Sequence, residues 1–97
     1  MTPTEIEALH RESIVIDAHC DTLGQVVEGQ RRLGERSTLG QFDLPRALDG
    51  GLTAELMATS FDPAISGGGV RQTIRYIDAY YQEIAAFSDM ATPAVSG

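Results

Sequence analysis

An apolar run passes directly into polar residues in the stretch Ser13-Ile14-Val15-Ile16-Asp17-Ala18-His19-Cys20-Asp21. Three consecutive β-branched residues, Ile14 to Ile16, favour a strand. Because the apolar residues are continuous rather than alternating, we expect both faces of this strand to be buried, as in a parallel sheet. The stretch therefore indicates a strand with polar groups at its carboxyl end.

The segments on either side of this strand are expected to be helical or irregular. Thr2, Pro3 and Glu5 predict a helix start with a capping box, and this helix extends to about Arg11. Residues 24–42 are rich in Gly and Arg and are expected to form a long, partly irregular excursion.

The second half of the chain repeats the pattern. Asp43 is expected to cap a short helix that ends at Gly50 and Gly51. A second strand is expected over residues 52–61 and a loop over residues 62–69. A helix is predicted over residues 70–87, with an apolar stripe formed by Val70, Ile74, Ile77, Tyr81, Ile84 and Ala85.

This order of elements is typical of an α/β fold with parallel strands. Two strands do not form an independent parallel sheet, because each would leave an exposed edge. The chain of 97 residues holds one domain at most, and we expect residues 1–97 to be the start of a larger domain.

Composition excludes several classes of function. The chain carries 7 basic residues, all Arg, against 14 acidic ones, so binding to nucleic acid or to an anionic membrane is not expected. Arg31, Arg32 and Arg36 are expected to form a solvated loop. The single cysteine excludes an internal disulfide framework. No apolar run approaches the ~20 residues of a membrane span, and no secretory signal is apparent, so a cytoplasmic location is expected.

The spacing of His19 and Asp21 indicates a metal site. Residues two apart on an extended strand point to the same face, here at the carboxyl end where parallel α/β folds place their ligands. An imidazole and a carboxylate together suit Zn²⁺, although a catalytic zinc takes three or more protein ligands. The other histidine, His10, precedes the strand, so the site must be completed from elsewhere. Alternatively, His19 is a core or loop histidine and Asp21 caps the following turn.

Other residues around the motif have less specific roles. Asp17 either orients a metal ligand through a hydrogen bond or is an acceptor at the strand end. Cys20 should point away from the two ligands as a packed thiol. Tyr81 is expected in the core, with Tyr76 and Tyr80 flanking it. Gly67-Gly68-Gly69 is expected to be a flexible loop rather than a phosphate-binding loop.

The segment Asp17-Ala18-His19-Cys20-Asp21-Thr22-Leu23 resembles the first metal-binding motif of the membrane (renal) dipeptidases, within the metal-dependent amidohydrolase superfamily. Gly40-Gln41-Phe42-Asp43-Leu44-Pro45-Arg46 and the second strand after Gly50-Gly51 are similar to the family's next block. The helix around residues 77–81 also lies where the family has one. The resemblance covers most of residues 13–90.

The resemblance implies a (β/α)₈ barrel with two zinc ions at its mouth that hydrolyses dipeptides. His19 and Asp21 would be ligands of one zinc. The bridging glutamate, the later histidines and the proton-shuttling acid of the family lie beyond the aligned region, so no catalytic residue is assigned here. The chain is then an N-terminal fragment that is inactive alone, and we expect it to self-associate through surfaces meant for the rest of the barrel.

Two alternatives remain open at this point. The chain could be a fragment of another metal-dependent amidohydrolase, but those more often carry His-x-His, so Asp21 favours the dipeptidases. It could also be a small α/β interaction module without catalysis, which would unfold cooperatively without metal and would not bind zinc tightly.

Overall fold

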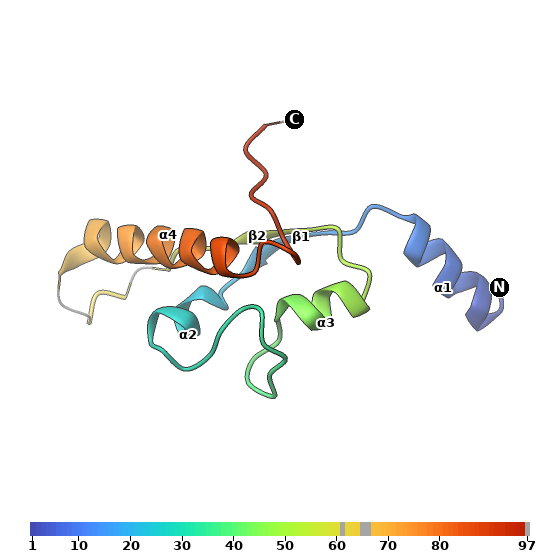
Figure 1. Cartoon of the computed structure of the whole chain (residues 1–97), viewed down its shortest axis with the longest axis horizontal. Helices are drawn as coiled ribbons and strands as arrows, with labels where there is room; N and C mark the ends of the chain where they lie inside the picture. The colour runs from blue at the N-terminus through green and yellow to red at the C-terminus, as the bar shows by residue number, and fades with distance from the viewer. Residues whose placement is uncertain (61, 65–66, 97) are drawn as a thin grey trace.

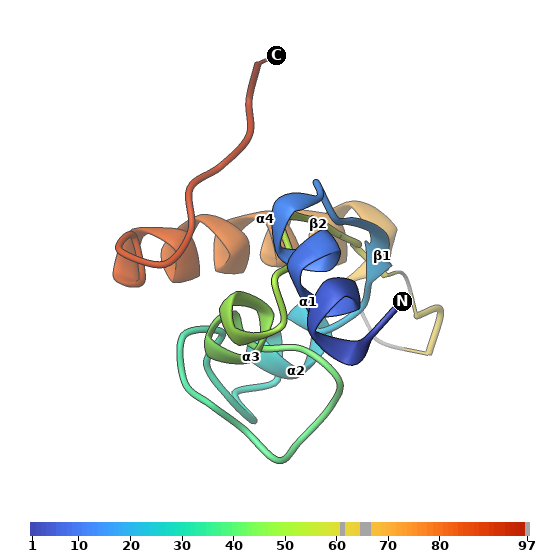
Figure 2. The same ribbon diagram turned by 90° about the vertical axis from the view of Figure 1, so that its right-hand side faces the viewer.

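The structure, a computed structural model, describes residues 1–60, 62–64 and 67–96 (Figure 1). Both views place α4 above α2 and α3 (Figures 1 and 2), and Figure 1 shows α1 at one end of the molecule. The elements follow the predicted order: α1 Pro3–Glu12, β1 Ile16–Cys20, α2 Leu23–Val27, α3 Leu44–Asp49, β2 Ala54–Met57 and α4 Gly68–Ala86. The predicted α/β class is therefore confirmed, while a barrel is not shown by these residues.

Helix α1 starts as its sequence predicts. The Thr2 hydroxyl accepts the Glu5 backbone N–H at 3.2 Å, and the Thr2 N–H donates to the Glu5 carboxylate at 2.6 Å. This reciprocal capping box satisfies amides that have no partner within the helix. At the other end, His10 Nε2 lies 2.6 Å from the Gly50 carbonyl oxygen, so a hydrogen bond links α1 to the end of α3.

The strands β1 and β2 pair in parallel, as predicted. Ile16 faces Ala54, Asp17 faces Glu55, and Cys20 faces Met57. From Asp17 to Cys20 β1 advances three residues while β2 advances two, so β1 contains a bulge. A bulge adds local twist and redirects the side chains beside it.

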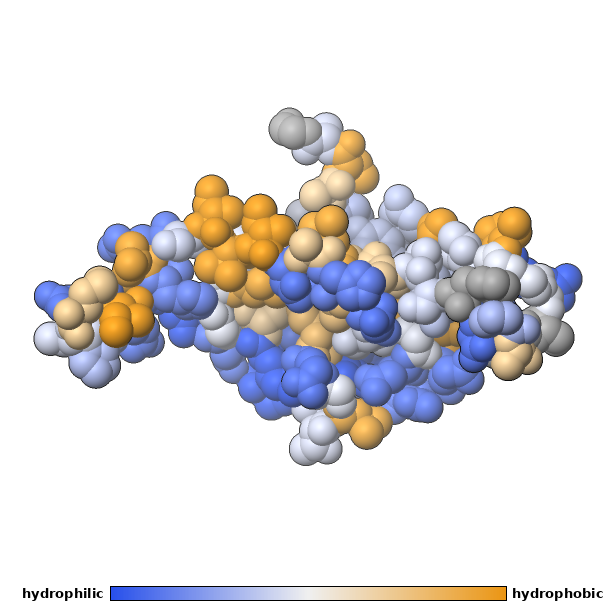
Figure 3. Space-filling view, turned by 180° about the vertical axis from the view of Figure 1, so that it is seen from behind, coloured by the Kyte–Doolittle hydropathy of each residue, from blue (hydrophilic) through white to orange (hydrophobic). Residues whose placement is uncertain are grey.

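The expected burial of the first strand on both faces is wrong for the described structure. All of β1 except Cys20 is exposed, and Ile16 is 60% exposed. The sheet among the described residues has two strands, so β1 pairs with β2 alone and its other edge is left open. Figure 3 shows hydrophobic residues gathered beside α1 on the side of the molecule turned away in Figure 1. The exposed hydrophobic residues include Ile14, just before β1, Ile16 in β1 and Leu56 in β2.

The core lies instead beneath the sheet, among α2, α3, α4 and the segment between α2 and α3. Leu23, Leu33 and Leu44 are buried there. Partly buried hydrophobic residues surround them: Val26, Phe42, Met57, Tyr76, Tyr80, Phe87, Met90 and Ala91. The segment of residues 24–42, predicted to be partly irregular, is thus helical at α2 and contributes Leu33 to the core.

Helix α4 confirms the predicted helix, but its apolar stripe faces away from the core. Tyr81 is 54% exposed, so its predicted place in the core is wrong, whereas Tyr76 and Tyr80 pack against the core. The inward face carries Glu83, whose carboxylate accepts the Arg32 side chain at 2.7 Å and the Leu33 N–H at 3.0 Å. These polar bonds fix the rotation of α4 against the segment beneath it.

The predicted solvated arginine loop is confirmed for Arg32 and Arg36, which are exposed, and is wrong for Arg31. Arg31 is only 8% exposed and donates to the carbonyl oxygens of Leu39, at 2.6 Å, and of Phe42. Arg32 pairs with Glu83, and Arg36 pairs with Asp49 at 2.5 Å. Backbone carbonyls in an irregular segment need donors, and the Arg31 guanidinium provides two of them.

The remaining predictions on the second half of the chain are confirmed in part. Asp43 caps α3 as expected, and β2 lies inside the predicted strand. The predicted strand end at Phe61 and part of the predicted loop, Ile65 and Ser66, lie outside the described residues. Gly67 is the residue before α4, with a φ of 105° that favours glycine.

Asp43 provides the first testable prediction. Its carboxylate is fully buried and accepts the backbone N–H groups of Ser37, at 3.0 Å, and Arg46, at 2.8 Å. Burial acts to raise the pKa of this carboxyl, but these backbone bonds and the Arg46 guanidinium outweigh it and lower the pKa. We expect Asp43→Ala to reduce the free energy of unfolding by about 2–4 kcal/mol, because a cap is lost and buried donors lose their acceptor.

Urea unfolding followed by circular dichroism measures this effect. Asp49→Ala is the matched control, because Asp49 makes an exposed ion pair worth about 0–1 kcal/mol. Because the pKa of Asp43 is lowered in the folded chain, its contribution is present above the ordinary pKa of 3.8 and is lost as the pH falls below that value. Equal losses in the two variants would contradict the prediction.

Candidate functional site

His19 and Asp21 converge at the carboxyl end of β1. His19 Nε2 lies 3.1 Å from Asp21 Oδ1, and the two side chains are 70% and 64% exposed. The structure therefore brings together the two residues that the sequence singled out. Both side chains are open to solvent, so His19 is not a packed core histidine.

The two donor atoms fit a shared zinc ion. Zinc–nitrogen and zinc–oxygen bonds of about 2.0–2.2 Å at a tetrahedral angle separate two ligand atoms by roughly 3.3 Å. The observed 3.1 Å separation of His19 Nε2 and Asp21 Oδ1 is close to this value. Among the described residues, no group of three or more His, Cys, Asp or Glu side chains is arranged to hold a metal ion. His19 and Asp21 could thus supply two ligands.

A pocket of about 560 Å³ opens beside these residues; we call it the strand-end pocket. A cavity of this size suits a small molecule or part of one. One wall comes from β1 and β2 and the other from the segment leading into α3 and from α3 itself. The residues that line it are Asp17, His19, Cys20, Asp21, Thr22, Gln25, Gly40, Gln41, Phe42, Arg46, Ala47, Leu52 and Glu55.

Asp17, two residues before His19, lines the same pocket. Asp17 Oδ1 accepts the backbone N–H of His19 at 3.4 Å. This contact lies within the bulge, where the simple alternation of side chains along β1 is interrupted. Cys20 accordingly also contributes to the pocket, and its thiol donates to the Thr22 hydroxyl at 3.2 Å.

Glu55 is a site residue that the sequence reasoning missed. It comes from β2 and lines the strand-end pocket opposite Asp17. Burial raises its pKa to about 7, the negative charge of Asp17 and a hydrogen bond to Asp17 add to the rise, and His19 opposes it. Its Oε1 atom is buried without a hydrogen-bond partner among the described residues. No local motif marks Glu55, because its role depends on the strand register.

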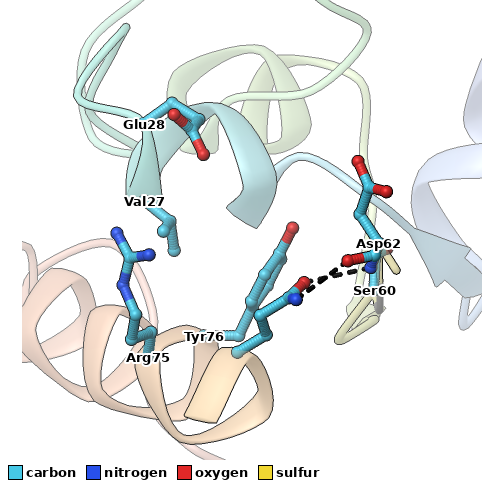
Figure 4. Close-up of a pocket in the computed structure, with 7 residues that line it drawn as sticks. Val27, Glu28, Ser60, Asp62, Arg75 and Tyr76 are labelled. Atoms are coloured by element: carbon cyan, nitrogen blue, oxygen red, sulfur yellow. Dashed lines mark hydrogen bonds between the residues drawn. The ribbon is translucent and has the colours of Figure 1, made fainter. Parts of the chain in front are cut away.

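A smaller pocket of about 250 Å³ lies between α2 and α4 (Figure 4). Val27 and Glu28 line it from α2 and its end, and Arg75 and Tyr76 line it from α4. The Gln72 side chain bonds the Asp62 backbone twice, at 3.0 Å and 2.9 Å, and so closes one side of it. Because Ser60 also donates to Asp21 Oδ1 at 3.3 Å, this pocket adjoins the candidate ligand pair.

These features define a parallel α/β unit whose polar side chains gather at the carboxyl ends of both strands. A scan of protein-family models matches residues 4–96 to the model described as "Membrane dipeptidase (Peptidase family M19)". The chain therefore belongs to the membrane dipeptidase family, and its residues correspond to an N-terminal portion of that family. Searches of the curated proteins and of the solved structures return no match.

Membership places the chain among peptidases, which hydrolyse peptide bonds, and supports dipeptidase-type function for the family's complete enzyme. Within the described residues, no helix is both long and apolar enough to cross a membrane.

The raised pKa of Glu55 gives the second prediction. A carbon-13 NMR titration should show the Glu55 carboxyl titrating near pH 7 rather than near its ordinary 4.5. In Asp17→Asn the apparent pKa should fall but stay above 4.5, because the charge of Asp17 is removed while burial remains. The carboxyl signal that disappears in Glu55→Gln identifies the residue.

The same shift sets the sign of a pH effect on stability. Because the folded chain holds a proton that the unfolded chain releases, the contribution of Glu55 is full below pH 4.5 and is lost as the pH rises through 7. A Glu55 signal that titrates near 4.5 in the unaltered chain would contradict the buried carboxyl pair.

Proposed function

We propose that this chain is the N-terminal segment of the barrel domain of a zinc-dependent dipeptidase, with His19 and Asp21 as ligands of one of two zinc ions. The convergence of His19 Nε2 and Asp21 Oδ1 at 3.1 Å, in a chain of the membrane dipeptidase family, carries the proposal. The parallel pairing of β1 and β2 is what the first two strands of a (β/α)₈ barrel require.

The chain's own residues would bind and orient the metal and one end of the substrate. His19 presents an imidazole nitrogen and Asp21 a carboxylate oxygen, while the Ser60 hydroxyl holds Asp21 Oδ1 from the β2 side. A bound zinc ion would supply a water molecule with a pKa near 7 and a positive charge for the scissile carbonyl. The substrate is a dipeptide, and D-residues at its C-terminal position are expected to be tolerated.

The fragment is proposed to be inactive by itself. A catalytic zinc takes at least three protein ligands and leaves one position open, and His19 and Asp21 are two. The chain should therefore bind zinc weakly. Self-association is also proposed, through exposed hydrophobic residues such as Ile14, Ile16 and Leu56.

Zinc binding provides the third prediction. Competition against a chromophoric chelator should show weak binding by the unaltered chain and at least about tenfold weaker binding by His19→Ala and Asp21→Asn, because each removes a ligand. His10→Ala is the matched control, since it removes the other histidine, which bonds the Gly50 carbonyl and lies outside the strand-end pocket.

Three results would contradict the proposal in different ways. Equal loss of zinc binding in His10→Ala and His19→Ala would remove His19 from the metal site. Zinc-dependent hydrolysis of dipeptides by purified residues 1–97 would show that the chain is not an inactive segment. A cooperative unfolding transition without metal, together with no zinc binding, would favour the non-catalytic interaction module.

A further inference from the structure

Two side chains of opposite charge line facing walls of the smaller pocket between α2 and α4, which we call the interhelix pocket. Figure 4 shows Arg75 rising from α4 toward α2, with Glu28 at the end of α2 on the opposite wall. Among the residues that the structure describes, neither side chain forms an ion pair or a hydrogen bond. The pocket therefore carries an unpaired positive charge on one wall and an unpaired negative charge on the other.

A hydroxyl group lies between these walls. The ring of Tyr76 stands on α4, and its hydroxyl points toward α2 (Figure 4). A Cβ atom at position 24 would lie 3.0 Å from this hydroxyl oxygen, so Gly24 is what lets the tyrosine reach α2. Within the part of the chain that the structure describes, the Tyr76 hydroxyl makes no hydrogen bond. It is thus available to donate to an oxygen atom of a ligand.

The size and the charges of the pocket define the class of ligand. Its volume of about 250 Å³ lies below the roughly 300–1,000 Å³ of pockets for drug-sized molecules. A simple anion would be attracted by Arg75 and repelled by Glu28, and a simple cation would meet the reverse. A small molecule that carries both charges is attracted by both walls. A carboxylate can accept two parallel N–H bonds from a guanidinium group, and an ammonium group donates to a carboxylate.

We propose that the interhelix pocket binds a free α-amino acid, with the ligand's carboxylate on Arg75 and the Tyr76 hydroxyl and its ammonium group on Glu28. The pocket adjoins the candidate metal site, because Ser60 lines it and donates to Asp21 Oδ1 at 3.3 Å. Addition of water to the peptide bond of a dipeptide releases two amino acids, so the pocket holds one product beside the site that forms it. The binding itself needs neither zinc nor the proposed function.

The test compares three small molecules by nitrogen-15 NMR titration of the metal-free chain at neutral pH and constant ionic strength. L-Alanine carries both charges, L-alaninamide lacks the carboxylate, and propionate lacks the ammonium group. Alanine should shift the amide signals of Glu28, Arg75 and Tyr76 with a Kd on the order of 1 mM, because solvent-exposed ion pairs are individually weak. Alaninamide and propionate should each bind at least about threefold more weakly, because each lacks one charged partner. This comparison needs no variant.

Two substitutions then remove one charge each from the pocket. In Arg75→Gln, alanine should lose its advantage over alaninamide, because the partner of the carboxylate is gone. In Glu28→Gln, alanine should lose its advantage over propionate. Arg71→Gln is the matched control, one turn earlier on α4 and outside the pocket, and should keep both preferences. All three positions are exposed, so these substitutions leave the core intact.

The results that would overturn the inference are distinct from those that concern the metal site. Signals that do not saturate with alanine, or equal affinities for the three molecules in the unaltered chain, would contradict it. A preference for alanine that survives both Arg75→Gln and Glu28→Gln would place the amino acid elsewhere and would also overturn it. The expected preferences in a chain that binds no zinc would support the inference and contradict only the metal site.

Discussion

The parallel pairing of β1 with β2 governs the arrangement of this chain. Parallel strands cannot be joined by a tight turn, so the residues between them must travel from the carboxyl end of one strand to the amino end of the next. Here that crossover contains α2, α3 and the irregular segment between them. It supplies all three buried leucines of the core, Leu23, Leu33 and Leu44, and its packing sets where α4 can lie.

Buried polar groups hold the crossover in place, because much of it lacks regular backbone hydrogen bonding. Asp43 accepts two backbone amides, Arg31 donates to two backbone carbonyls, and Glu83 of α4 accepts the amide of Leu33. Such groups are costly to bury unless they are hydrogen-bonded. Their pairing therefore specifies one conformation for a segment whose apolar core is small.

Parallel pairing also creates the candidate site. It places the carboxyl ends of β1 and β2 side by side, so that Ser60, after β2, bonds Asp21, after β1. Glu55 faces Asp17 earlier along the two strands and lines the same pocket as His19 and Asp21. The bulge then decides which side chains face the pocket. The Ser60 hydroxyl beside the Asp21 carboxylate is a support of the kind that metal ligands commonly have.

Much of this could be predicted from the sequence, because the signals are local. The capping box of Thr2 and Glu5, the Asp43 cap and the convergence of His19 with Asp21 depend on a few neighbouring residues, and each is found where expected. The strand itself begins only at Ile16, the last residue of the β-branched run. The family could also be predicted, because its motifs are short stretches of sequence, residues 17–23 and residues 40–46, that are read without knowledge of the fold.

Tertiary structure alone decided the rest. Which face of α4 turns inward depends on Glu83 meeting a segment some 50 residues away, so the apolar stripe with Tyr81 was assigned to the wrong side. Arg31 is buried because distant carbonyls need its donors. Glu55 joins the site through the strand register and the bulge, and neither is encoded in its neighbours along the chain. Local sequence thus determined the elements and the two candidate ligands, whereas long-range polar pairing determined what faces them.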